Sequence, residues 1–214
     1  CTYLARRDKG LARIMAGVGD LQLEVRRNRS VFEYLCRSIV YQQLSGKAAS
    51  TIHGRLLDLF PNRRVAPGQL LAMPVEHLRA AGLSRSKCIA LVDLADRGAA
   101  GELPDTRALH AMSDELIIER LSEVRGVGEW TVQMLLIFYL GRADVLPIRD
   151  LGVLKGYQKM RRLATLPKPS RLARAGRRWQ PYRSCRREGI KKSRETIKKE
   201  QHSVGYCQRR CERG

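Results

Sequence analysis

Leu121-Ser-Glu-Val-Arg-Gly-Val-Gly-Glu-Trp-Thr131 is the stretch that decides the fold of this 214-residue chain. Its pattern predicts two helices joined by a glycine hairpin over residues 121–132. We expect Gly126 and Gly128 to adopt positive φ, which glycine does at no steric cost. The amides at the start of the second helix would point outward, and the helix dipole there attracts phosphate. A plain corner between two core helices is the alternative, since Gly-x-Gly alone is a weak signal.

An aspartate follows this stretch later in the sequence. Asp150 comes twenty residues after Trp130, between Pro147 and Leu151-Gly152. That setting predicts a helix start, where the ordinary role of an aspartate is to cap the helix. Its place after the hairpin favours chemistry on whatever the hairpin holds. An aspartate of unperturbed pKa, about 4, is ionised at neutral pH.

A third candidate segment is Tyr41-Gln-Gln-Leu-Ser-Gly-Lys47, which ends an otherwise apolar helix with a tyrosine and two amides. Gln42 can read the edge of a base, and Tyr41 can stack on it. Leu44 can fill the gap that an extruded base leaves in a duplex. The alternative is a frayed helix end with solvated glutamines.

The rest of the pattern is helical and predicts an all-α fold. Ser30 and Glu33 form a capping box ahead of a helix that should end near residues 44–46. Further helices are predicted from about 47 to 60, between Pro74 and Gly82, after Ser84 or Ser86, and after Ser113. We find no strand alternation.

The charge is concentrated late in the chain. Residues 151–214 carry 20 Lys and Arg against 4 Asp and Glu, within a net charge of +20 for the whole chain. A basic segment of this density favours phosphate-rich partners. Residues 185–214 contain few large apolar side chains and are predicted to be a divergent basic tail. Two interpretations of these residues stay open: a solvated, disordered tail, or a tail that adds a contact with DNA.

The spacing of the cysteines and the shortness of the apolar runs indicate the cellular compartment. Six cysteines lack the close spacing of an iron–sulfur site, and Cys207 and Cys211 are poorly spaced for zinc. No run approaches the roughly 18 apolar residues of a membrane span, and no secretory signal is visible. We therefore expect a reduced, intracellular protein that does not enter membranes. The start at Cys1 instead of Met suggests a piece of a longer chain.

Five motifs in order carry a resemblance to a known family. Residues 38–49, 81–87, 124–131, 144–152 and 179–184 are similar to motifs of the helix-hairpin-helix (HhH-GPD) DNA glycosylase superfamily, in its DNA-3-methyladenine glycosylase II branch. The resemblance implies one glycosylase domain over residues 1–184, built as two all-α lobes with the active site in the cleft between them.

The resemblance also implies a site. Asp150 would be the catalytic carboxylate, and Trp130 and Tyr41, with Gln42, would receive the base. No cofactor would be required, although the carbonyls of Val124 and Val127 would help to bind a monovalent cation. The residues expected to contact DNA are Gly126, Val127, Gly128, Arg125, Leu44, Lys47 and Lys87.

The implied reaction is hydrolysis of an N-glycosidic bond in base excision repair. Relatives that also cleave the strand carry a Schiff-base lysine where this chain has Trp130, so we expect a monofunctional enzyme. Its partner would be duplex DNA carrying 3-methyladenine or 7-methylguanine, bound by a monomer in the bacterial cytoplasm and nucleoid or in a nucleus.

The chain departs from the family pattern at three places. Arg149 stands where an acid is common, Leu154 where a basic residue is common, and residues 185–214 where an apolar helix is expected. We interpret the last as a replaced or frame-shifted C-terminus. A DNA-binding protein with impaired catalysis is therefore the alternative function.

Overall fold

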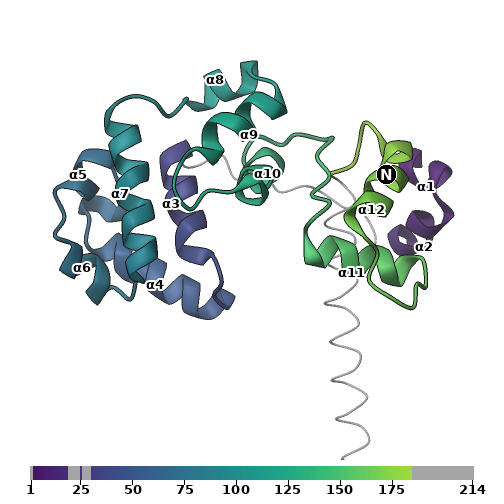
Figure 1. Cartoon of the computed structure of the whole chain (residues 1–214), viewed down its shortest axis with the longest axis horizontal. Helices are drawn as coiled ribbons and strands as arrows, with labels where there is room; N and C mark the ends of the chain where they lie inside the picture. Colours follow the sequence, from purple (N-terminus) through teal and green to yellow (C-terminus); the bar gives the residue numbers. More distant parts are fainter. Residues whose placement is uncertain (1, 19–24, 26–29, 185–214) are drawn as a thin grey trace, which may run out of the picture. The chain divides into compact units, whose positions relative to one another are not determined.

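The computed structural model describes residues 2–18, 25 and 30–184, and these residues are helical with no strand (Figure 1). The all-α prediction is confirmed for them, and the predicted tail at 185–214 lies outside them. The elements are α1 (Thr2–Arg7), α2 (Lys9–Val18), α3 (Val31–Tyr41), α4 (Gly46–Asp58), η1 (Pro61–Arg63), α5 (Pro67–Leu71), α6 (Val75–Ala80), α7 (Arg85–Ala99), α8 (Thr106–Ala111), α9 (Asp114–Ser122), α10 (Glu129–Phe138), α11 (Leu151–Met160), α12 (Pro169–Gly176) and η2 (Arg177–Trp179).

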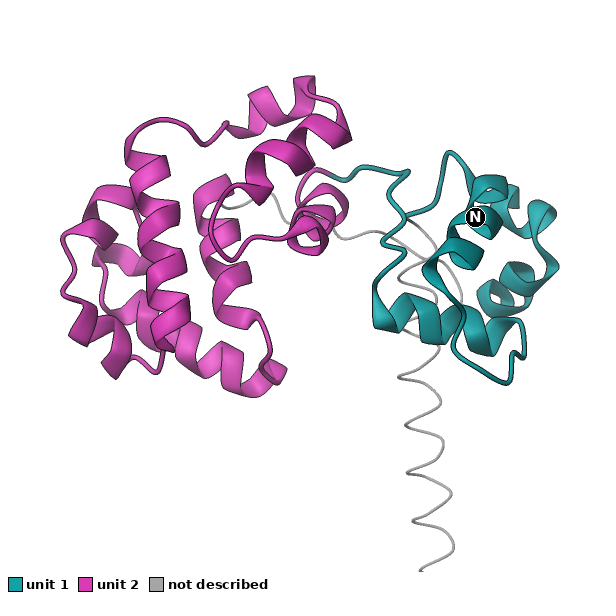
Figure 2. Cartoon of the chain, viewed as in Figure 1, with its two compact units in different colours: residues 1–24, 141–214 teal, residues 25–140 magenta. Residues whose placement is uncertain are grey.

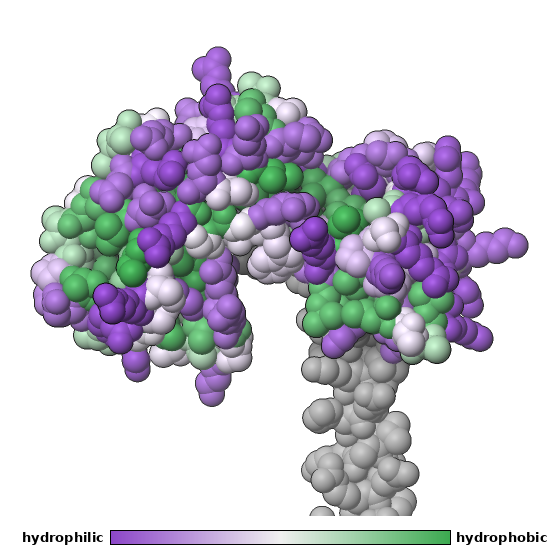
Figure 3. Space-filling view, viewed as in Figure 1, coloured by the Kyte–Doolittle hydropathy of each residue, from purple (hydrophilic) through white to green (hydrophobic). Residues whose placement is uncertain are grey.

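The helices form two compact units, as the two-lobed prediction requires (Figure 2). Unit 2 is continuous and contains residues 25–140, from α3 to α10. Unit 1 is discontinuous, because α1 and α2 pack with the chain after residue 141. Hydrophilic residues cover much of the visible surface of both units (Figure 3).

Local capping interactions fix the helix starts. Ser30 and Glu33 form the predicted capping box, with both reciprocal hydrogen bonds present. Ser84, and not Ser86, caps α7, and Ser113 caps α9. Because these interactions span only three residues, the sequence alone located the caps at Ser30 and Ser113 and limited the third to Ser84 or Ser86.

The end of α3 differs from the prediction. The helix stops at Tyr41, before the expected end at residues 44–46. Gln42 is extended, and Gln43 adopts a φ of 56°, so the backbone leaves the helix there. A new helix, α4, then begins after the cap Ser45.

Unit 1 is built around one buried carboxylate, Asp8, whose side chain is 0% exposed. Its Oδ1 accepts hydrogen bonds from the amides of Gly10, at 2.9 Å, and Leu11, at 3.4 Å. Its Oδ2 accepts from Arg161 at 2.5 Å and from Trp179 Nε1 at 3.0 Å. Asp8 thus links the start of α2 to Arg161, at the end of α11, and to Trp179, in η2.

The apolar core of unit 1 surrounds this network. Leu154, which departs from the family pattern, is only 6% exposed within that core, so an apolar side chain suits its position. None of the helices in the described residues is both long enough and apolar enough to cross a membrane. The buried core residues are Leu4, Leu11, Val153, Leu154, Tyr157, Met160, Leu172 and Trp179.

Candidate functional site

The hairpin between α9 and α10 is closed by its own main chain. The amide of Val127 donates to the carbonyl of Val124 at 2.9 Å, and both valines are 2% exposed. Gly126 has the predicted positive φ, at +79°. The prediction was wrong for Gly128, which has φ −95° and ψ 170° because it is the extended N-cap residue of α10.

This cap leaves the start of α10 suited to an anion. Gly128 has no side chain, so no cap side chain bonds the amides of the first turn. The partial positive charge at a helix N-terminus then remains available to a phosphate. The helix start at Gly128 therefore suits the predicted backbone contact, whereas the amide of Val127 is already bonded to the carbonyl of Val124.

The hairpin rests on α7. The amide of Arg125 donates to Asp93 Oδ2 at 2.8 Å. A Cβ placed on Gly126 would lie 3.0 Å from the Cβ of Ala90. Because Asp93 and Ala90 both belong to α7, this helix sets the position of the turn.

We expect Gly126→Ala to destabilise the chain more than Gly101→Ala. Both glycines have positive φ, +79° and +74°, so alanine is strained by about 1–2 kcal/mol at either position. Only at Gly126 does the added methyl group meet a neighbour, because nothing lies within 4 Å at Gly101. Urea unfolding measures the difference. Equal losses of stability for the two variants would show that the contact with Ala90 is not tight.

Two predicted DNA-contact or base-contact residues make internal contacts. Gln42 Nε2 donates to the carbonyl of Gly126 at 2.8 Å, which ties the end of α3 to the hairpin. Lys87 Nζ donates to the carbonyls of Val40 and Gln42, at 2.7 and 2.9 Å. Burial lowers the pKa of the Lys87 ammonium below its ordinary value. Lys87 thus holds the end of α3, and Gln42 links that end to the hairpin.

The predicted stacking residue Tyr41 is already in contact with a cation. The guanidinium of Arg37 lies 3.8 Å from the centre of its ring. His53 meets the same ring edge-on, with the centroids 5.9 Å apart. Sequence reasoning missed Arg37, although its position four residues before Tyr41 on a helix places it on the same face.

The other unit 2 candidates are accessible. Trp130, the second residue of α10, is 47% exposed, and Leu44 is 38% exposed. The residues Lys47 and Arg125 are exposed too. A half-exposed tryptophan beside a phosphate-binding turn is suited to stacking on a base.

Asp150 lies in unit 1 as the N-cap residue of α11. It is 8% exposed, and its Oδ1 accepts from the amide of Val153 at 2.8 Å. The capping role proposed as the alternative is therefore present. The neighbouring Arg149 is exposed.

Two of the motifs in unit 1 hold the segment that leads to Asp150. Arg183 forms a two-pronged ion pair with Asp144, at 2.6 and 2.8 Å. Ser184 Oγ donates to the carbonyl of Arg142 and accepts from the amide of Val145. The motif at 179–184 thus fixes the start of the segment 144–150.

The described residues contain no group of three His, Cys, Asp or Glu side chains placed to hold a metal ion. Main-chain carbonyls are the other kind of ligand available for a cation. The carbonyl of Val124 accepts one hydrogen bond, from Val127, and a carbonyl oxygen has a second lone pair.

Comparison with known proteins places the fold. The family described as HhH-GPD superfamily base excision DNA repair protein matches residues 36–181. DNA-3-methyladenine glycosylase 1 of Schizosaccharomyces pombe is 36% identical over 171 residues, which cover 77% of this chain and 73% of that protein.

Two solved structures are similar over nearly the whole chain. The 3-methyladenine DNA glycosylase of Schizosaccharomyces pombe, in complex with abasic DNA, matches with a TM-score of 0.81 and 31% identity, covering 88% of this chain and 93% of that chain. The DNA-3-methyladenine glycosidase of Bacillus halodurans matches with a TM-score of 0.82 and 31% identity, covering 92% and 90%.

Proposed function

Since the chain belongs to the HhH-GPD superfamily of base excision DNA repair proteins, in its 3-methyladenine glycosylase branch, we propose that it hydrolyses the N-glycosidic bond of alkylated purines in duplex DNA. The substrates are 3-methyladenine and 7-methylguanine, and the protein acts on DNA as a monomer. The observation that carries the proposal is Trp130, left 47% exposed directly after a hairpin whose helix start suits a phosphate.

Binding begins with the DNA backbone. The amides at the start of α10 receive a phosphate, and Lys47 and Arg125 add charge without reading sequence. Leu44 enters the stack where the damaged nucleotide leaves it. Gln42 holds the hairpin through the carbonyl of Gly126, and Lys87 holds the end of α3 that carries Gln42.

The extruded base is held by aromatic side chains. A purine alkylated at a ring nitrogen is cationic and stacks on Trp130 through cation–π attraction. The ring of Tyr41 also contacts the base. The guanidinium of Arg37, 3.8 Å from the centre of that ring, either moves away for the base or stays on one face of the ring. The positive charge of the base also makes it a good leaving group that needs little acid assistance.

The carboxylate of Asp150 supplies the remaining stabilisation. Positive charge develops on the sugar as the glycosidic bond breaks, and an ionised carboxylate stabilises that oxocarbenium-like state. The same group orients the attacking water and accepts its proton. The hydrogen bond from Val153 holds Asp150 Oδ1 in place during the reaction.

The reaction stops at an abasic site. Trp130 stands where relatives that cleave the strand carry a lysine, and an indole cannot form a Schiff base. The carbonyls of Val124 and Val127 are oxygen ligands of the kind that hard cations prefer, so they would hold a monovalent cation beside the bound phosphate. No step above depends on that ion.

We expect Trp130→Ala to lower kcat/KM for release of 7-methylguanine by about ten- to a hundredfold, because a base stacked on an aromatic ring gains roughly 1–3 kcal/mol. Release from methylated DNA measures this. Leu71→Ala, at a side chain that is 38% exposed, is the matched control and should keep full activity. Trp130→Phe should restore most of the activity. If wild-type protein binds the methylated duplex but releases no base, the chain is the catalytically impaired binder instead.

A further inference from the structure

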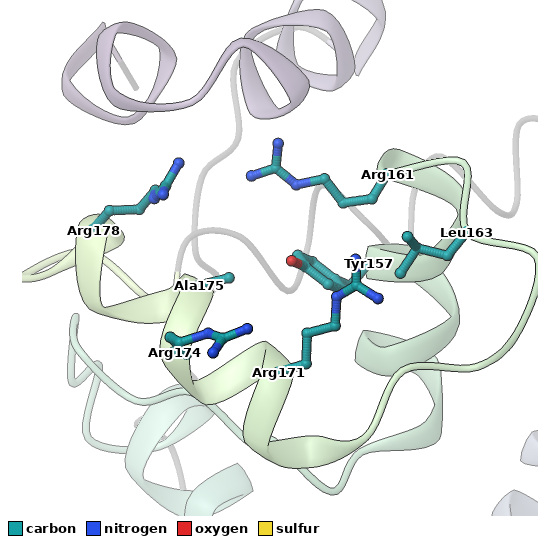
Figure 4. A pocket seen from close by; sticks show the side chains of 7 residues that line it. All are labelled: Tyr157, Arg161, Leu163, Arg171, Arg174, Ala175 and Arg178. Atoms are coloured by element: carbon teal, nitrogen blue, oxygen red, sulfur yellow. The ribbon is translucent and has the colours of Figure 1, made fainter.

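A pocket of about 470 Å³ opens on unit 1, lined by four arginines (Figure 4). Arg161 reaches into it from the end of α11, and Arg171, Arg174 and Arg178 reach into it from α12 and η2. The spacing of the last three, at i, i+3 and i+7, puts them on one face of a helix. The remaining lining residues are Tyr157, Leu163 and Ala175.

The positive charge of this pocket is poorly compensated. Among the described residues, only Arg161 has an ion pair there, with Asp8 at 2.5 Å. Residues 151–184 contain ten Lys and Arg and no Asp or Glu, so this segment supplies no counter-charge of its own. Gathering like charges around one cavity costs free energy that a bound anion recovers.

Buried aromatic packing makes the floor of the pocket rigid. Tyr157 is 5% exposed, and its ring packs edge-on against Trp179, with the centroids 6.2 Å apart. Arg161 is held by the buried Asp8 and lies 5.8 Å from the centre of the Tyr157 ring. One guanidinium is therefore preorganised, while Arg171, Arg174 and Arg178 are exposed and able to close on a ligand.

The pocket is separate from the carboxylate proposed for catalysis. Asp150 caps the start of α11, whereas Arg161 follows its last residue, Met160. A ten-residue helix is about 15 Å long. A base held at Asp150 therefore does not occupy the arginine pocket.

We propose that the arginine pocket is a second phosphate-binding site, which takes a phosphate group between Arg161 and the three arginines of α12 and η2. One guanidinium group donates two parallel hydrogen bonds to two oxygens of a phosphate. This two-pronged geometry favours arginine over other anion-binding side chains. The volume is in the range of sites for small ligands. The phosphate belongs either to a compact oligophosphate or to the backbone of bound DNA, and both present the same oxygens.

The test compares two double variants of equal charge. Arg171→Gln with Arg174→Gln removes two lining residues of α12, whereas Lys159→Gln with Arg177→Gln removes two exposed charges from α11 and η2 that lie outside the lining. Both are measured by calorimetric titration with inorganic pyrophosphate. Binding to an undamaged duplex is measured across a salt series, and urea unfolding checks that both variants fold.

An oligophosphate site predicts at least tenfold weaker pyrophosphate binding in the lining variant and less than threefold change in the control. A DNA-backbone site predicts that the salt dependence of duplex binding falls by about one in the lining variant alone, because that variant no longer neutralises the one DNA phosphate held in the pocket. Either result supports the site and identifies the source of the phosphate. If the two double variants behave alike with both probes, the pocket is only a solvated basic surface and the proposal is wrong.

Discussion

Asp150→Asn is expected to lower the rate of base release from methylated DNA by about a thousandfold, since a group that stabilises developing charge is worth up to that factor. Asparagine is nearly isosteric and caps helices as well as aspartate does. The start of α11, where Asp150 Oδ1 accepts from Val153, is therefore preserved. We expect duplex binding to change less than threefold. Single-turnover release and a binding titration measure the two quantities.

The chain provides a matched control for this substitution. Asp105 caps α8 in the same way, accepting from the amide of Ala108 at 2.7 Å. Asp105→Asn should leave base release unchanged. If Asp150→Asn is also fully active, the capping role alone explains Asp150, and the catalytic carboxylate has to be sought elsewhere.

Asp8→Ala is expected to destabilise unit 1 by about 3 kcal/mol. Removing one partner of a buried ion pair typically costs 3–5 kcal/mol, and the part of Arg161 that stays solvated reduces this figure. The substitution also leaves Trp179 Nε1 buried without its acceptor and removes the oxygen that caps α2.

The position of the two tryptophans makes this prediction measurable for unit 1 by itself. Trp130 belongs to unit 2 and Trp179 to unit 1, and the chain has no others. In a Trp130→Phe background, fluorescence during urea unfolding therefore reports on Trp179 alone. Asp58→Ala, which breaks an exposed ion pair with Arg63 in unit 2, should leave this Trp179 transition unchanged. Equal shifts for the two variants would contradict the central role of Asp8.

The local features of this fold could be predicted from the sequence because their causes are local. The capping box at Ser30, the cap at Ser113 and the positive φ of Gly126 each depend on residues only a few positions apart. The N-terminal helices α1 and α2 and the short helices α5 and α8 were not predicted. The helices α1, α5 and α8 have only five or six residues, and propensity alone rarely stabilises so short a helix.

The supports of the candidate site depend on contacts between distant residues, and the sequence pattern does not contain them. Lys87 meets the carbonyls at the end of α3 from 47 and 45 positions away, and Gln42 meets Gly126 across 84. From the sequence, Lys87 and Gln42 were therefore interpreted as groups that face DNA. Gly128 was misjudged for a related reason, since a glycine at a cap and a glycine in a turn look alike until the following helix is placed.

The hydrogen bond between Trp179 and Asp8 joins residues 171 positions apart. This separation affects how the protein folds during its synthesis. At translation rates of about 5–20 residues per second, the first helices wait roughly ten to thirty seconds for their partner. Unit 2 emerges complete in the meantime. During that interval the leucines of α1 and α2 are the surface that a chaperone would recognise on the nascent chain.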